Sequence, residues 1–226
     1  MSNREFLPFS TIIARTLGDL NGVRAADIGC GSGNVTRKLA DLGAEVTGVE
    51  PNADQVARAR AQGGGPSYVV APGEATGLED GAFDVVLFSR SLHHAGDMAA
   101  ALREACRILR PGGRVAVMEP EPEGPFTPIM AFVDDERPVY AKAQAALEAA
   151  VADSLLSRGP SLRFATKYRV RDAGAMLDDM ITVDNGRSLA EADRPAFEAA
   201  FAAAHIDDDK GGYIPDWSRL DVFTRE

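Results

Sequence analysis

The chain has 226 residues, 45% of them hydrophobic and 26% charged, with a formal net charge of -10 at neutral pH. These values are ordinary for one large domain with a buried core, whereas the acidic balance disfavours partners that are themselves polyanions, such as nucleic acid and anionic membranes. The two cysteines are too few for a disulfide framework, residues 1–10 lack the pattern of a secretory signal, and no apolar run approaches the ~18 residues of a membrane span. We therefore expect a cytoplasmic protein without a membrane or nucleic-acid partner.

Through the first half of the chain, short apolar runs bounded by glycine, proline or asparagine alternate with amphipathic segments. This is the pattern of buried strands separated by helices, which predicts a parallel sheet. Ser10 is expected to cap a first helix that ends near Asn21. The other helices of this half are expected at Asn34–Leu42, Asn52–Ala61 and Met98–Leu109. The strands are expected at Val23–Ile28, Glu45–Glu50, Tyr68–Val70, Phe83–Phe88 and Arg114–Met118.

The second half of the chain is less regular. Helices are expected at Val139–Leu156, Arg171–Met180 and Pro195–His205, and further strands at Ile181–Asn185 and Leu220–Thr224. Together the elements predict an α/β fold with a doubly wound, mostly parallel seven-stranded sheet and helices on both faces. We interpret residues 1–226 as a single domain whose core spans about 23–119. Residues 121–166 are interpreted as an inserted helical cover over the active site.

The first predicted strand leads into a glycine-rich loop, Asp27-Ile28-Gly29-Cys30-Gly31-Ser32-Gly33, and then into a helix. Glycines let the backbone turn sharply and approach a ligand, and the free amides at the start of a helix favour an anionic group. The dinucleotide fingerprint Gly-x-Gly-x-x-Gly does not fit, because its third glycine would fall on Asn34 or Thr36. The loop therefore argues against a nicotinamide oxidoreductase.

Two more elements follow strands of the same sheet, and ligands bind beyond the carboxyl ends of such strands. Glu50 ends the second strand, 21 positions after Gly29, where a carboxylate can accept both hydroxyl groups of a ribose. NAD enzymes share this spacing, so Glu50 alone does not select a cofactor. Gly73-Glu74-Ala75 follows the third strand, and a side-chain acceptor beside a backbone amide suits the edge of an adenine.

With these motifs in order, the chain resembles the class I S-adenosylmethionine (SAM)-dependent methyltransferases, specifically the group that acts on small molecules. The resemblance covers roughly residues 23–119. It is carried by the segments Ala26-Asp27-Ile28-Gly29-Cys30-Gly31-Ser32-Gly33, Val46-Thr47-Gly48-Val49-Glu50-Pro51, Gly73-Glu74-Ala75, Phe83-Asp84-Val85-Val86-Leu87-Phe88 with Leu92-His93-His94, and Leu109-Arg110-Pro111-Gly112-Gly113 with Val115-Ala116-Val117.

The resemblance implies SAM as the cofactor and a role for each matching residue. Asp27 would order the loop and meet the methionine amino group through water, and the loop glycines would line the methionine portion. Glu50 would hold the ribose, and Glu74, in place of the aspartate common in this family, would read the adenine with Ala75. Ser89 would lie beside the methionine amine through its backbone carbonyl. The cofactor-binding set is thus Asp27, Gly29, Cys30, Gly31, Glu50, Pro51, Glu74, Ala75 and Ser89.

Three residues are candidates for moving a proton, namely His93, His94 and Glu119. A general base is needed only when the acceptor arrives protonated, as a hydroxyl or an ammonium group. Histidine suits the task near neutral pH, although a histidine at this place can equally be structural. Glu119 can bind an acceptor or simply be solvated. Arg90 can pair with a substrate carboxylate or with a neighbouring acid.

Other features favour simpler interpretations. Cys30 is interpreted as a small buried residue and not a nucleophile, and His205 beside Asp207-Asp208-Asp209 as a solvated helix end, so no metal is expected. We expect a methyltransferase that moves the methyl group of SAM to oxygen, nitrogen or carbon of a small-molecule acceptor by in-line displacement. A protein or RNA acceptor, and a SAM-binding protein without catalysis, stay open as alternatives. So does a homodimer.

Overall fold

The computed structural model describes residues 4–183 and 186–226. Its strands are β1 (Arg24–Ile28), β2 (Glu45–Glu50), β3 (Ser67–Val70), β4 (Phe83–Ser89), β5 (Leu109–Pro120), β6 (Leu156–Arg169), β7 (Ile206–Asp208) and β8 (Gly211–Arg225). Its α-helices are α1 (Phe9–Thr16), α2 (Asn34–Asp41), α3 (Ala53–Ala61), α4 (Met98–Ile108), α5 (Phe126–Met130), α6 (Arg137–Ala152), α7 (Ala173–Val183) and α8 (Arg194–Ala204).

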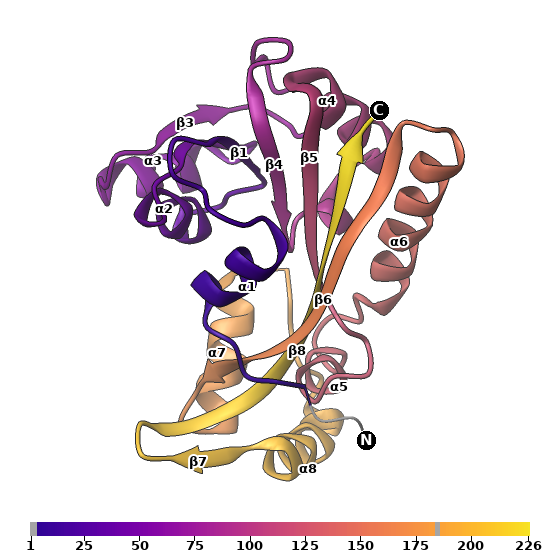
Figure 1. The fold of residues 1–226 in the computed structure, drawn as a ribbon. Coiled ribbons are helices and arrows are strands. Elements are labelled where there is room, and N and C mark those ends of the chain that lie inside the picture. Colours follow the sequence, from indigo (N-terminus) through magenta and orange to yellow (C-terminus); the bar gives the residue numbers. More distant parts are fainter. Residues whose placement is uncertain (1–3, 184–185) are drawn as a thin grey trace. The chain divides into compact units, whose positions relative to one another are not determined.

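The strands follow one another in the order β3-β2-β1-β4-β5-β8-β6 (Figure 1). The pairs from β3 to β5 are parallel, and β7 pairs antiparallel with β8 outside this path. The predicted doubly wound, mostly parallel seven-stranded sheet is therefore confirmed, with β7 as an additional short strand. The chain runs outward from β1 to β3 and then returns to the other side of β1 with β4. In sheets of this kind the point of reversal, between β1 and β4, opens a crevice for a ligand.

The residues of the chain divide into two compact units. The larger comprises Pro8–Glu119, Ala141–Leu162 and Arg219–Glu226, and the smaller comprises Met1–Leu7, Pro120–Tyr140 and Arg163–Ser218. The larger unit contains β1 to β4, β5 up to Glu119, residues 156–162 of β6 and residues 219–225 of β8. The single-domain organisation of the chain stays a prediction. Within the described ranges, no helix is long and apolar enough to cross a membrane.

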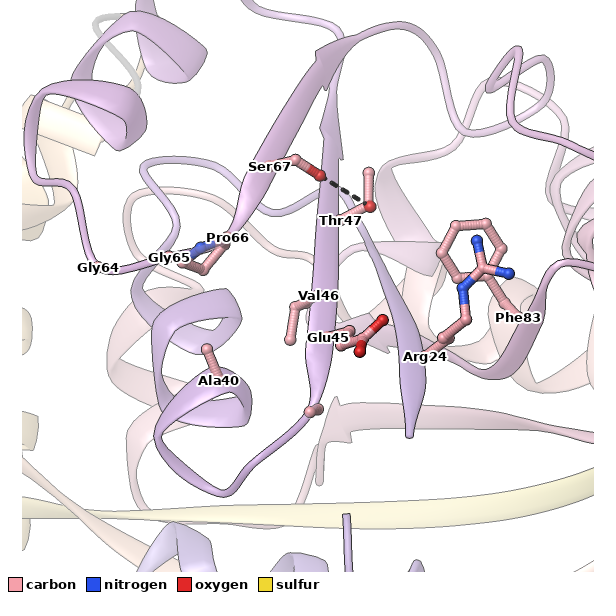
Figure 2. Close-up of a pocket in the computed structure, with 11 residues that line it drawn as sticks. Arg24, Ala40, Glu45, Val46, Thr47, Gly64, Gly65, Pro66, Ser67 and Phe83 are labelled. Atoms are coloured by element: carbon pink, nitrogen blue, oxygen red, sulfur yellow. Dashed lines mark hydrogen bonds between the residues drawn. The ribbon is translucent and has the colours of Figure 1, made fainter. Parts of the chain in front are cut away.

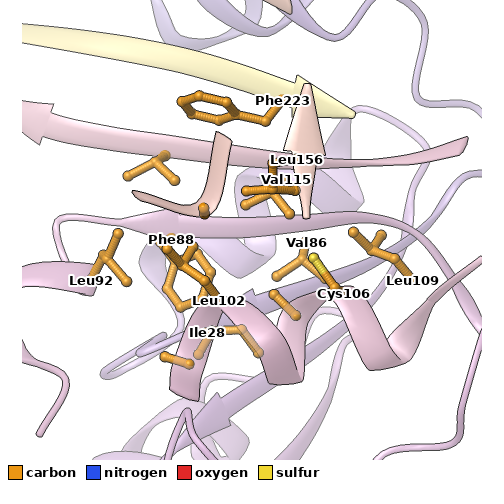
Figure 3. Packing of buried hydrophobic residues seen from close by; sticks show 14 of the residues in the cluster. Ile28, Val86, Phe88, Leu92, Leu102, Cys106, Leu109, Val115, Leu156 and Phe223 are labelled. Carbon is orange, nitrogen blue, oxygen red and sulfur yellow. The ribbon is translucent and has the colours of Figure 1, made fainter. Parts of the chain in front are cut away.

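The main core of the larger unit lies between one face of the sheet and helices α4 and α6. Val86 and Phe88 of β4 belong to this core, together with Leu102 of α4 and Leu147 of α6. Figure 3 shows Leu102 directed toward Phe88 and Ile28 of the sheet. Side chains alternate along a strand, so Val85 and Leu87, which are equally buried, face the opposite side. Burial on both faces is the reason that β4 reads as a continuous apolar run.

The smaller unit has a core of its own. Met176 and Met180 of α7 pack with Phe197 and Phe201 of α8 and with Ile214 of β8. In the same unit, the Glu121 carboxylate is almost fully buried and accepts a hydrogen bond of 2.6 Å from Arg4.

Most of the predicted elements are found within a few residues of their expected bounds, and two helix starts are capped by side chains. The Asn52 side chain accepts from the Asp54 and Gln55 amides at 2.9 and 3.2 Å, and the Asp97 side chain accepts from the Ala100 amide at 2.9 Å. The expected cap at Ser10 is wrong. Helix α1 begins at Phe9, after Pro8, and has no side-chain cap.

Two predictions in the second half of the chain are also wrong. Residues 181–183 of the expected strand Ile181–Asn185 form the last turn of α7, and 184–185 lie outside the described residues. The β-branched run there suggested a strand, but the buried residues Met176, Leu177 and Met180 have helical spacing and extend the helix. The segment 121–166 is not entirely helical, because it includes the first part of β6.

Strand β6 escaped prediction because it is the outermost strand next to β8 and its first half is mostly exposed. Edge strands carry charged residues and proline, here Arg158 and Pro160, in place of an apolar alternation. Gly159 marks the pairing with β8, since a Cβ atom there would lie 2.9 Å from the Val222 carbonyl oxygen.

Replacing Leu102 with alanine should lower the free energy of unfolding by about 2–5 kcal/mol, because this fully buried side chain would leave a cavity between α4 and the sheet. Urea denaturation of the variant measures the loss. Val70→Ala is the matched control. Val70 is 46% exposed, so its truncation should cost no more than about 1 kcal/mol. Equal losses for the two variants would contradict the assignment of this core.

Candidate active site

The loop that joins β1 to α2 has a backbone that only glycine adopts without strain. Gly29 and Gly33 have φ angles of +73° and +78°. A Cβ atom on Gly29 would lie 2.4 Å from the Cβ atom of Ser91, and one on Gly33 would lie 2.4 Å from the Tyr68 hydroxyl oxygen. Both glycines are therefore required by close packing as well as by the turn.

Glu50, at the end of β2, is held by two backbone amides. The Gly31 amide donates to Oε2 and the Asn52 amide donates to Oε1, both at 3.0 Å. The carboxylate thereby links the glycine loop to the start of α3. Charge-assisted hydrogen bonds of this kind keep a carboxylate in one place.

Asp27 lies beneath the loop and is 1% exposed. Its Oδ2 accepts a hydrogen bond of 2.7 Å from the Thr36 hydroxyl group, while its Oδ1 is buried with no hydrogen-bond partner among the described residues. Burial raises the pKa of Asp27 to about 6, and the hydrogen bond from Thr36 opposes this rise. A buried, half-satisfied carboxyl group under a ligand loop is suited to meeting a polar or cationic group of the ligand.

Cys30 lies in the same loop, and the pKa of its thiol is also raised. Burial, followed by the nearby Asp27 and Glu50 carboxylates, raises the pKa of its thiol to about 12. Since the thiolate is the reactive form, this raised pKa disfavours a nucleophilic role for Cys30 at neutral pH.

A cavity of about 480 Å³ opens at the carboxyl ends of β1, β2 and β4 and at the loop after β3. This is the reversal point of the strand order, and the volume falls within the range of small-molecule sites, roughly 300–1,000 Å³. Its lining residues are Ile28, Gly29, Glu50, Pro51, Pro72, Gly73, Glu74, Phe88, Arg90, Ser91, His94, Ala95 and Gly96.

The structure thus brings Gly29, Glu50, Pro51, Glu74 and His94 of the sequence-predicted set to one cavity. The Glu74 carboxylate also accepts the Asp97 amide at 3.0 Å, which joins the loop after β3 to the loop after β4. Of the other predicted cofactor residues, Asp27, Cys30 and Gly31 lie within the glycine loop and beneath it, Ser89 ends β4, and Ala75 is exposed; none of these five lines the cavity.

The three predicted proton-moving residues lie together. His93 and His94 form a short 3-10 helix, η1 (Leu92–His94), and their ring centroids are 4.0 Å apart. Glu119 of β5 interacts through one carboxylate oxygen with His93 Nδ1 at 2.5 Å and accepts the His93 amide through the other at 3.3 Å. His94 lines the cavity, whereas the buried His93 and its partner Glu119 lie behind it.

Ser91 belongs to the site but was missed by sequence reasoning. Its hydroxyl group donates to the Ile28 carbonyl oxygen at 2.5 Å, and its side chain packs where a Cβ atom of Gly29 would be. The only signal for it in the sequence is a small residue shortly after the end of β4. Its partner lies 63 positions away, so the contact exists only in the folded chain.

A second cavity, of about 490 Å³, lies at the opposite ends of the strands, where β1, β2, β3 and β4 begin (Figure 2). There the Arg24 guanidinium group lies 5.4 Å from the centroid of the Phe83 ring, and the hydroxyl groups of Thr47 and Ser67 are 2.9 Å apart. None of the predicted site residues lines it. The cavity at the carboxyl ends is therefore the candidate active site.

Comparison with known proteins agrees with this geometry. Residues 26–117 match the family of methyltransferase domains. The chain is 33% identical over 105 residues to a malonyl-[acyl-carrier protein] O-methyltransferase of Pseudescherichia vulneris, a match that covers 46% of this chain and 42% of that protein. It is 39% identical over 105 residues to a ubiquinone biosynthesis O-methyltransferase of a Methylobacterium species, covering 42% of this chain and 39% of that protein. The chain thus spans about two fifths of the length of these relatives.

A solved structure, that of a putative methyltransferase from Bacillus halodurans, shares the fold with a TM-score of 0.62 at 17% identity, covering 90% of this chain and 93% of that one. The strand order and the glycine loop define a Rossmann-like fold with a cavity at its switch point. Residues 26–117 are thus similar to a methyltransferase domain, and the strand order and the cavity at the switch point agree with that similarity.

The raised pKa of Asp27 predicts how the free energy of unfolding changes with pH. Because the folded-state pKa of about 6 lies above the ordinary value of 3.8, the folded chain binds this proton more tightly than the unfolded chain does. The resulting stabilisation is fully present below pH 3.8 and is lost as the pH rises through 6. In Asp27→Asn, which keeps an acceptor for Thr36, the free energy of unfolding should rise relative to the native chain by on the order of 2–3 kcal/mol between pH 4 and pH 7.

Urea denaturation at four pH values, without SAM and at low protein concentration, measures this difference. Asp41→Asn, at an exposed position of α2, serves as the control and should run parallel to the native chain. If the stability of Asp27→Asn also changes with pH in parallel with that of the native chain, Asp27 is not held as a buried carboxyl group.

Proposed function

We propose that this protein transfers the methyl group of SAM to a small-molecule acceptor. The observation that carries the proposal is that one cavity is lined by Gly29, Glu50 and Glu74, from three separate cofactor motifs, and also by His94. A transferase needs both cofactor-binding residues and a proton acceptor at the same cavity, whereas a protein that only binds SAM needs no proton acceptor.

The residues present fit SAM. Asp27 Oδ1 is a buried oxygen without a partner among the described residues, the loop approaches closely only because Gly29 has no side chain, and two carboxylates line the cavity wall. We assign Glu50 to the ribose hydroxyls, Glu74 to the adenine edge and Asp27 to the methionine amine. Pro51 and Ile28 supply apolar surface beside them. When bound, SAM supplies a methyl group that is electrophilic because its sulfur carries a positive charge.

The protein's own contribution is then to align the acceptor and to receive its proton. Holding two reactants in line removes much of the entropic barrier. His94, at the cavity wall, is assigned as the group that accepts a proton from a hydroxyl or ammonium acceptor. Glu119 fixes the ring of His93 by contacts to its Nδ1 and its amide, and the His93 ring lies against that of His94. His93 and Glu119 therefore act as positioning residues.

A small-molecule acceptor is favoured over a macromolecule. The net charge of -10 opposes the approach of RNA. The two curated relatives are named as O-methyltransferases, which makes oxygen the first atom to test as the methyl acceptor. A cytoplasmic location and a homodimer stay predictions.

Replacing Glu50 with alanine should weaken SAM binding at least tenfold, because the ribose loses its acceptor and the Gly31 and Asn52 amides lose theirs. Isothermal titration calorimetry with SAM and S-adenosylhomocysteine measures the affinity, and NADH should not bind. Glu45→Ala is the matched control, since Glu45 is an exposed carboxylate at the other end of the same strand. Unchanged affinity for SAM in Glu50→Ala would contradict the assignment of Glu50 to the ribose hydroxyls.

Replacing His94 with alanine should lower the rate of methyl transfer to a hydroxyl acceptor by about 10²-fold or more near neutral pH, the usual contribution of a general base. Labelled SAM, first used to screen malonyl thioesters and hydroxylated aromatic acids for an acceptor, gives the rate. His93→Ala should lower the rate less, and His205→Gln, which changes the only other histidine of the chain, should not affect it. Full turnover in a His93→Ala, His94→Ala double variant would exclude a histidine base.

A further inference from the structure

The ionisable side chains at the cavity wall come from the ends of different strands. Glu50 and Glu74 come from the ends of β2 and β3, and backbone amides hold them, from Gly31 and Asn52 in the first case and from Asp97 in the second. Arg90 and His94 come from the segment after β4. Arg90 is the only arginine or lysine among the residues that line the cavity.

The backbone of Arg90 has an unusual conformation. Its φ angle is +56°, and among the described residues only Arg90 and Ser154 are non-glycine residues with a positive φ. The Arg90 amide donates to the Met118 carbonyl oxygen of β5 at 2.8 Å, which ties this residue to the end of the sheet. A glycine would adopt this conformation without strain, and strained non-glycine residues are concentrated at functional sites. The arginine side chain is therefore retained at a position that the backbone alone would assign to glycine.

We propose that Arg90 binds a carboxylate of the methyl acceptor, so that the substrate is a small organic acid. This inference rests on the proposed function. A guanidinium group presents a planar fork of donors that matches the two oxygens of a carboxylate. In a chain with a net charge of -10, an anionic acceptor needs a local cation to enter the site. An acid held by Arg90 would share the cavity with His94, the assigned proton acceptor, which also lines it.

The test compares matched acids and amides. Labelled SAM is incubated with the protein and with pairs that keep the same hydroxyl acceptor and differ only in the charged group, such as hydroxybenzoate with hydroxybenzamide. Methyl transfer to the acids should exceed transfer to the amides at least tenfold in kcat/KM. In Arg90→Gln the KM for the acid should rise at least tenfold, and in Arg90→Lys, which keeps the charge and loses the fork, it should rise by less.

Three controls separate recognition of the acceptor from other roles. Arg90→Gly relieves the backbone conformation, so it should unfold at the same temperature as the native chain or a higher one and still lose the preference for acids. Calorimetry should give SAM affinities within twofold of the native value for all three Arg90 variants. Arg58→Gln, at an exposed position of α3, should change neither the affinity for SAM nor the KM for acids.

Each other outcome overturns the inference. A tenfold loss of SAM affinity in Arg90→Gln would assign Arg90 to the carboxylate of the cofactor. Equal transfer to acids and amides, an unchanged KM in the variant, or bound SAM with no transfer to any acid would exclude recognition of an acid by Arg90. Failure of the native chain to bind SAM would instead refute the proposed function itself, so the two failures are distinguishable.

Discussion

The candidate active site depends on one carboxylate that is shared between two loops. Glu50 accepts the Gly31 amide from the loop after β1 and the Asn52 amide at the start of α3. Because β1 and β2 are neighbours in register, with Ile28 opposite Val49, the ends of these strands lie at the same edge of the sheet and the carboxylate can reach both loops. Sheet order, glycine loop and cavity wall are therefore parts of a single arrangement, and a change in any one of them would displace the other two.

In the same arrangement, different strands contribute different kinds of residue to the cavity. Strands β1 and β2 and the loop after β3 supply glycines and carboxylates, which suit the amine, ribose and adenine of SAM. Strand β4 lies on the other side of the reversal point and leads into Arg90, Ser91 and His94. Strand β5 places Glu119 behind them, against His93. Under the proposed function no covalent step from the protein is required, and these residues would bind the cofactor, align the acceptor and remove its proton.

Sequence reasoning was accurate where burial on both faces of a parallel sheet dictates an unbroken apolar run. Strand β4 was placed to within a residue for this reason. It was inaccurate where tertiary contacts outweigh local pattern. Edge strand β6 has no apolar alternation. The β-branched residues 181–183 continue α7 because the buried residues Met176, Leu177 and Met180 have helical spacing. The motif residues Gly29, Glu50 and Glu74 were found, whereas Ser91 was not, because its role is a contact with Ile28 and Gly29 at long range.

The sequence by itself determined the motifs at the strand ends, since the spacing of the glycines, Glu50 and Gly73-Glu74-Ala75 is local in the chain and does not fit the dinucleotide fingerprint. Only the tertiary structure decided which candidates act together. His93 and Glu119 are 26 positions apart, yet they meet because β4 and β5 are neighbours, and that contact leaves His94 as the histidine at the cavity. Pairing of this kind depends on strand order and register, which a single sequence encodes only through the complete fold.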